Sequence, residues 1–205
     1  MRYMKIPKTE TPPSVEDFRK FLPRDRDLTR WQKTLKDTMV WQYENQNGGY
    51  KWDTSSGDGC VQNHKHPTSG ESLLSSKENT YCCGVTLELY WCSLIKYLEE
   101  LKEPGLIPSY KDFQAMRAWW YVYGLQYWTG GAGGVVIALQ RAIINRLRIV
   151  DPNATIYDGR FPLEFQYHTD PFQAEFGAQI QLQPYEDPMK GGHSCVFIGM
   201  EKQIW

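Results

Sequence analysis

The sequence contains no apolar run of the roughly 18 residues that a helix needs to span a bilayer. Charge of one sign is not in excess either, because 23 Lys and Arg stand against 24 Asp and Glu, for a formal net charge of −1. A chain this close to neutral has no general attraction to nucleic acid or to an anionic membrane. We therefore expect no nucleic-acid partner and no membrane span.

The amino-terminal residues, MRYMKIPKTETPPSVEDF, lack the apolar core of a secretory signal peptide. The five cysteines are odd in number, and their spacing has none of the regularity of a disulfide framework. Free thiols are typical of a reducing compartment. These absences predict a protein that stays in the cytoplasm or is exported by a route other than Sec.

Hydrophobic periodicity divides the chain into helices first and strands last. Helices are expected over residues 15–21, 25–46, 82–102, 110–128 and 135–150, and strands within 176–185 and 194–205. This order predicts one α+β domain. Its parts are a helical N-terminal region (1–49), a long polar loop (50–81), a helix (82–102), a further helical region (103–155) and an antiparallel sheet (156–205).

Two adjacent cysteines stand where one of these helices begins, in TYCCGVTLELYW, residues 80–91. The free N–H groups and the dipole of a helix N-terminus favour a negative charge, so a thiol there is readily converted to a thiolate. A cysteine nucleophile also needs a base within hydrogen-bond reach. Among the four histidines, His193 is the best candidate, because it follows Gly191 and Gly192 and opens a predicted strand.

These segments resemble the NlpC-type cell-wall peptidases, a branch of the papain-like cysteine hydrolases. The nucleophile motif of that family is Asp-Cys-Ser-Gly at a helix N-terminus, and residues 80–92 are similar to it. In the same family a strand leads to Gly-His and then to an apolar strand, and residues 176–205 are similar to that part. The resemblance implies a papain-like α+β core, here with a helical insertion over 103–155.

The resemblance also implies a role for each matching residue. Cys82 takes the nucleophile position, followed by Cys83 and Gly84, and His193 takes the general-base position after Gly192. The implied activity is hydrolysis of an amide bond through a Cys–His acyl-enzyme, without a cofactor. Peptides, and peptidoglycan stem peptides in particular, are the implied substrates.

The sequence departs from the family pattern in three places. Tyr81 stands where the family has Asp, and about a hundred residues separate Cys82 from His193. The third, polar residue that orients the histidine falls near the end of the sequence, where Gln203 is the nearest polar side chain. Either Gln203 serves, or the orienting group comes from elsewhere, or the natural polypeptide continues.

The same sequence features are compatible with other functions. A non-catalytic binding or assembly protein could keep the same scaffold, and an acyltransferase could use the same acyl-enzyme. Cys60, His64 and His66 are zinc-competent residue types, and Cys82 or Cys83 could complete four ligands of a metal-dependent hydrolase. Their spacing matches no zinc signature. We therefore expect the loop residues to border the Cys82 cleft without a metal.

Two remaining features are interpreted as structural. TGGAGG, residues 129–134, follows a predicted aromatic helix, so it lacks the preceding strand and the spacing of a nucleotide-binding loop. Cys92 and Cys195 fall within apolar runs and are expected in the core.

Overall fold

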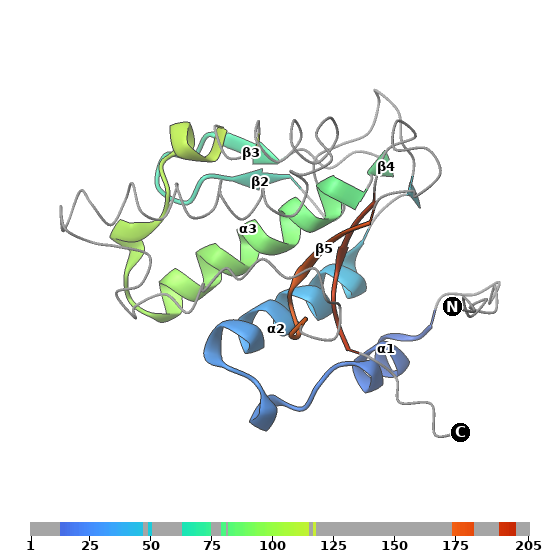
Figure 1. Ribbon diagram of the computed structural model, residues 1–205. Helices are drawn as coiled ribbons and strands as arrows, with labels where there is room; N and C mark the ends of the chain where they lie inside the picture. The colour runs from blue at the N-terminus through green and yellow to red at the C-terminus, as the bar shows by residue number, and fades with distance from the viewer. Residues whose placement is uncertain are drawn as a thin grey trace, which may run out of the picture.

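The computed structural model describes residues 13–46, 49–50, 63–74, 79–80, 82–114, 117, 174–182 and 193–199. These residues form helices and three two-stranded sheets, two of them antiparallel (Figure 1). The described part is thus of mixed α+β character, as predicted. The helix predicted over 135–150 lies outside it. No helix among the described residues has the length and apolar character needed to cross a membrane.

Helix α1, Val15–Phe21, begins where a side chain caps its first free N–H groups. The Ser14 hydroxyl accepts a hydrogen bond from the Asp17 N–H at 3.1 Å. The helix attaches to the rest of the fold through Phe18, whose ring stacks on Tyr43 with centroids 4.3 Å apart. The predicted helix over 15–21 is confirmed.

Helix α2, Arg30–Asn45, begins later than predicted. A capping box sets its start: the Thr29 hydroxyl accepts from the Gln32 N–H, and the Gln32 side chain accepts from the Thr29 N–H. The preceding Asp25–Asp27 forms a separate 3-10 helix, η1. The prediction of one helix over 25–46 is therefore wrong in its first turn, because the spacing of apolar residues does not reveal where a capping residue starts a helix.

Helix α3, Cys82–Glu100, has 19 residues and packs on α2. It forms because its apolar residues recur at helical spacing, and these residues supply about half of the hydrophobic core of the described part. Leu87, Leu94 and Leu98 have at most 1% of their surface exposed, and the Trp91 ring packs against Phe113 with centroids 4.5 Å apart. The helix predicted over 82–102 is confirmed to within two residues.

The end of α3 is fixed by a left-handed residue. Lys102 has φ of 60°, its N–H donates to the Glu99 carbonyl, and the Glu103 N–H donates to the Leu98 carbonyl. These are the two hydrogen bonds of a Schellman motif, which satisfy carbonyls left over at a helix C-terminus.

Strands β5, Gln179–Leu182, and β6, His193–Val196, pair antiparallel. Their register places Gln179 opposite Val196 and Leu182 opposite His193. β6 packs on α3, and Figure 1 shows the two strands crossing beside the first half of that helix. The predicted antiparallel strands on this helix are confirmed for these residues.

The segment predicted as a long loop, 50–81, contains short strands. β2, His64–Lys65, pairs antiparallel with β3, Ser72–Leu74, and the two lie along α3 (Figure 1). β1, Gly49–Tyr50, pairs parallel with β4, Asn79–Thr80. Strands of two or three residues leave almost no alternation in the sequence, so periodicity does not reveal them.

Candidate functional site

Cys82 is the first residue of α3, as predicted, and is buried, with 5% of its surface exposed. The Thr86 hydroxyl donates to the Cys82 carbonyl at 2.9 Å within the first turn. Gly84, also in this turn, is buried. The Cys82 thiol therefore lies at the positive end of a long helix and inside the fold.

His193 is the first residue of β6, as predicted, and this strand packs on α3. Cys195 follows two residues later and is partly buried. Burial raises the pKa of the Cys195 thiol above its ordinary value, and electrostatic interaction with Cys82 raises it further. β6 packs on α3, and Figure 1 shows the β5–β6 pair beside the first half of that helix.

Several predicted site residues lie outside the described part of the structure. These are Cys60, Gly192 and Gln203, together with the side chains of Cys83 and His193. The distance between the Cys82 sulfur and the His193 ring therefore stays a prediction.

A second group of polar residues surrounds Glu88, in the middle of α3. Glu88 is fully buried, with 0% exposed. Gln42 Nε2, from α2, donates to Glu88 Oε2 at 3.0 Å, and His64 Nε2, from β2, lies 2.7 Å from Oε1. A buried carboxylate is costly unless it is paired and hydrogen-bonded. The network of Gln42, Glu88 and His64 thus joins α2, α3 and β2 around one buried acid.

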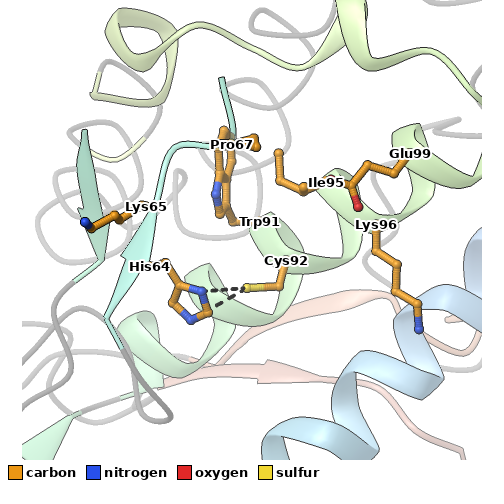
Figure 2. A pocket seen from close by; sticks show the side chains of 8 residues that line it. All are labelled: His64, Lys65, Pro67, Trp91, Cys92, Ile95, Lys96 and Glu99. Atoms are coloured by element: carbon orange, nitrogen blue, oxygen red, sulfur yellow. Dashed lines mark hydrogen bonds between the residues drawn. The ribbon is translucent and has the colours of Figure 1, made fainter. Parts of the chain in front are cut away.

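Cys92 lies beside this network, and its sulfur is 3.8 Å from both ring nitrogens of His64 (Figure 2). A sulfur equidistant from both nitrogens lies off the in-plane axis of each, so it is aligned for a hydrogen bond with neither. Burial, and then the Glu88 charge, raise the pKa of the Cys92 thiol well above its ordinary value. Cys92 therefore stays protonated at neutral pH and is unsuited to act as a nucleophile.

His66 has a structural role that its sequence context does not reveal. It is 3% exposed, and its Nε2 lies 2.7 Å from the Pro108 carbonyl oxygen. A carbonyl only accepts, so Nε2 donates. Nδ1 then accepts from the Ser69 N–H at 3.3 Å and contacts the Thr68 hydroxyl at 3.0 Å. Both ring nitrogens are engaged, and the ring lies 6.4 Å from that of Trp91.

The contacts of His64 and His66 are made well past the start of α3. The prediction set both histidines at the border of a cleft at Cys82. The α3 residues that they contact are Glu88, Trp91 and Cys92. The rise of an α-helix alone separates Cys92 from Cys82 by about 15 Å.

Glu88 is the residue that sequence reasoning missed. It is the one charged residue in CCGVTLELYWCSLI, residues 82–95. A single acid inside an apolar helical run was the available signal, because such a residue has to be paired if the helix is buried. Its partner His64 could not be identified in the same way, because it comes from a polar segment without periodicity.

Among the described residues, no group of three or more His, Cys, Asp or Glu side chains is arranged to hold a metal ion. Comparison of the chain with protein-family models, with curated proteins and with solved structures finds no match.

Proposed function

We propose that the protein is a thiol-dependent hydrolase that cleaves an amide or peptide bond, with Cys82 as nucleophile and His193 as general base. The observation that carries the proposal is the packing of β6, which begins at His193, on α3, which begins at Cys82.

The chemistry follows from these roles. The Cys82 thiol gives its proton to His193, and the helix N-terminus stabilises the resulting thiolate, which attacks the carbonyl carbon of the substrate to form a tetrahedral oxyanion. Backbone N–H groups in the first turn of α3 donate to that oxyanion. His193 protonates the departing amine, and the acyl-enzyme forms. His193 then takes a proton from water, which attacks the thioester and releases the acid and the Cys82 thiolate, with His193 left protonated for the next cycle.

The proposed scaffold is a papain-like core in which the nucleophile helix packs on an antiparallel sheet. Support comes from the order of elements, a helix starting with cysteine and then a hairpin whose second strand starts with histidine. The sequence resemblance adds the substrate class, namely peptides or peptidoglycan stem peptides. Gln203, or another polar group, would orient the histidine.

The proposal is tested with three single variants, each assayed on peptides and on peptidoglycan and each checked by thermal melting. Cys82→Ala and His193→Ala should each lower the hydrolysis rate by about 10⁴-fold or more, because the two residues act as one unit. Cys83→Ala is the matched control. It should retain most activity, because its side chain is rotated by about 100° around the helix.

Two results would contradict this assignment. Loss of activity in Cys83→Ala with retention in Cys82→Ala would move the nucleophile by one residue. A folded wild-type protein that hydrolyses none of the tested amides would overturn the enzymatic proposal.

The second candidate is a non-catalytic binding protein on the same scaffold. The observation that favours it is the low exposure of Cys82, at 5%, which limits access of a substrate carbonyl to the sulfur. Binding of peptide or peptidoglycan fragments that is equal for wild type and Cys82→Ala, without hydrolysis, would support this function.

A further inference from the structure

The turn that leads into β5 is held by side chains from both long helices. The Tyr90 hydroxyl, on α3, donates to the Gly177 carbonyl at 2.7 Å. Gln32 Nε2, on α2, donates to the neighbouring Phe176 carbonyl at 3.2 Å. Two consecutive carbonyls are therefore bound by two helices, so this turn cannot slide along either helix without losing a hydrogen bond.

Each of the two donors is itself held in place. Gln32 Oε1 accepts from the Thr29 N–H at 2.9 Å in the capping box of α2, which leaves Nε2 to donate to the turn. Tyr90 is buried in the hydrophobic core, with 6% of its surface exposed. Gly177 approaches α2 so closely that Leu35 occupies the place of a Cβ atom. The turn is therefore fixed by two oriented hydrogen bonds and by a close backbone approach.

The β5–β6 hairpin transmits the position of this turn to its far end. The Gly177 N–H donates to the Phe197 carbonyl at 2.9 Å, and the Phe197 N–H donates to the Ala178 carbonyl at 2.8 Å. The pairing continues in unbroken register until Leu182 lies opposite His193. A continuous ladder resists sliding, because a shift of register would break its hydrogen bonds together. The point at which the turn is held therefore determines where the backbone of residue 193 lies.

The hairpin is long enough to reach the start of α3. His193 lies opposite Leu182, five residues beyond Gly177, which is about 17 Å at the rise of a β-strand. Tyr90 lies eight residues beyond Cys82, which is about 12 Å at the rise of an α-helix. Figure 1 shows the two strands running obliquely across α3 toward the end at which the helix begins. A hairpin held at Tyr90 can therefore bring the backbone of residue 193 level with the first turn of α3.

We propose that Gln32 and Tyr90 are positioning residues that set His193 relative to Cys82 through the β5–β6 hairpin. The proposed function gives His193 and Cys82 their roles, and the positioning role rests on it. Gln32 and Tyr90 act at the opposite end of the hairpin from the reacting atoms. Loss of either hydrogen bond lets the far end shift, and a displacement of about 1 Å at the reacting atoms can lower the rate about 100-fold.

The test uses variants of the full chain that remove one donor each and keep the rest of the side chain. Tyr90→Phe removes the hydroxyl, and Gln32→Glu keeps the acceptor of the capping box while an oxygen replaces Nε2. Ser93→Ala is the matched control, because it removes a buried hydroxyl of α3 that donates to the Leu89 carbonyl within the helix. Thermal melting checks that each variant is folded, and kcat and KM of peptide hydrolysis are measured well below the melting temperature.

A second measurement does not depend on hydrolysis. It is the rate at which iodoacetamide alkylates Cys82 at pH 7, in each variant with and without His193→Ala. A histidine beside the thiol assists formation of the thiolate, so His193→Ala should slow this alkylation about tenfold in the otherwise wild-type chain. When Tyr90→Phe and Gln32→Glu are combined, alkylation should already be slow, and adding His193→Ala should change it by no more than about twofold. A general loss of stability does not produce such non-additivity.

The hydrolysis rates should follow the same order. Tyr90→Phe and Gln32→Glu should each lower kcat about tenfold, and together about 100-fold, with KM changed by no more than about threefold. Ser93→Ala should keep kcat within about twofold of wild type. The single variants keep one of the two hydrogen bonds, so they should stay folded and show the alkylation pattern at a smaller amplitude.

The positioning role is overturned if wild type hydrolyses peptides and the folded variants do so with an unchanged kcat, a result that leaves the proposed function intact. It is also overturned if His193→Ala does not slow alkylation of Cys82 in the otherwise wild-type chain, or slows it equally in the Tyr90 and Gln32 variants. Absence of hydrolysis in wild type, together with the expected alkylation pattern, would contradict the proposed function and support the positioning role.

Discussion

Helix α3 carries two thiols in opposite settings. Cys82 lies at the start of the helix, where the dipole favours a negative charge, and this helix packs on β6. Cys92 lies ten residues further on, beside β2 and next to the buried Glu88 carboxylate, which disfavours a negative charge. The comparison shows that two thiols on one helix have different electrostatic surroundings, which depend on their position along the helix and on the neighbours at that position.

The largest expected effect tests the buried Glu88 carboxylate beside Cys92. His64→Ala removes one partner of a buried carboxylate and should lower the free energy of unfolding by about 3 kcal/mol. Chemical denaturation measures the change. Lys65→Ala, at the exposed neighbouring residue, is the control and should change stability by no more than about 0.5 kcal/mol. A loss below about 1 kcal/mol in His64→Ala would show that the His64–Glu88 contact contributes little to the fold.

The next effect compares the two thiols directly. At pH 7, Cys82 should react with iodoacetamide about 100-fold faster than Cys92, because alkylation requires the thiolate and the pKa of Cys92 is raised. Thiolate forms as pH rises through the pKa. Labelling of Cys92 should therefore stay low until the pH is well above the ordinary pKa of a cysteine thiol. Peptide mapping by mass spectrometry over time measures both rates. Equal rates at the two sites would show that the two thiols do not differ in reactivity.

A third prediction compares the two hairpins that flank α3. Gly177, before β5, has φ of +85°, and an added Cβ would clash with Leu35 Cδ2. Gly70, between β2 and β3, has φ of +73° and nothing within 4 Å of such a Cβ. Gly177→Ala should therefore cost about 2 kcal/mol or more, and Gly70→Ala about 1 kcal/mol.

Thermal melting of the two variants measures this difference. Equal costs would show that the β5 turn can shift away from α2 without loss. In that case the packing of the β5–β6 hairpin would be looser than the structure indicates.

The smallest expected effect concerns the hydrogen bond that connects α3 to the turn before β5. The Tyr90 hydroxyl donates to the Gly177 carbonyl at 2.7 Å, and burial raises the pKa of Tyr90. Tyr90→Phe should lower stability by about 1 kcal/mol, because the carbonyl loses a donor inside the fold. Tyr110→Phe is the control, since its partly buried hydroxyl accepts from the Gln114 side chain nearby. A Tyr90→Phe protein as stable as wild type would show that water replaces the lost donor.

Sequence by itself determined those features that depend on neighbouring residues. The α3 helix was predictable because its leucines recur at helical spacing, and its start at Cys82 was predictable from the polar segment before it. The β5 and β6 strands were predictable from the alternation of apolar and polar residues. Their antiparallel pairing was predictable because the two strands follow each other closely in the sequence. The start of α2 was missed although Thr29 and Gln32 form a capping box, a signal that the sequence does contain.

Only the tertiary structure decided which distant residues meet. Glu88 was visible as an isolated acid, but its contacts with Gln42 and His64 join residues 46 and 24 positions away in the chain. No local rule relates such positions, because the side-chain contact depends on which turn of α3 the short strand β2 lies against. For the same reason His64 could be assigned to the vicinity of Cys82 from its type and place in the sequence, whereas the fold sets it against Glu88 and Cys92, about 9–15 Å further along the helix.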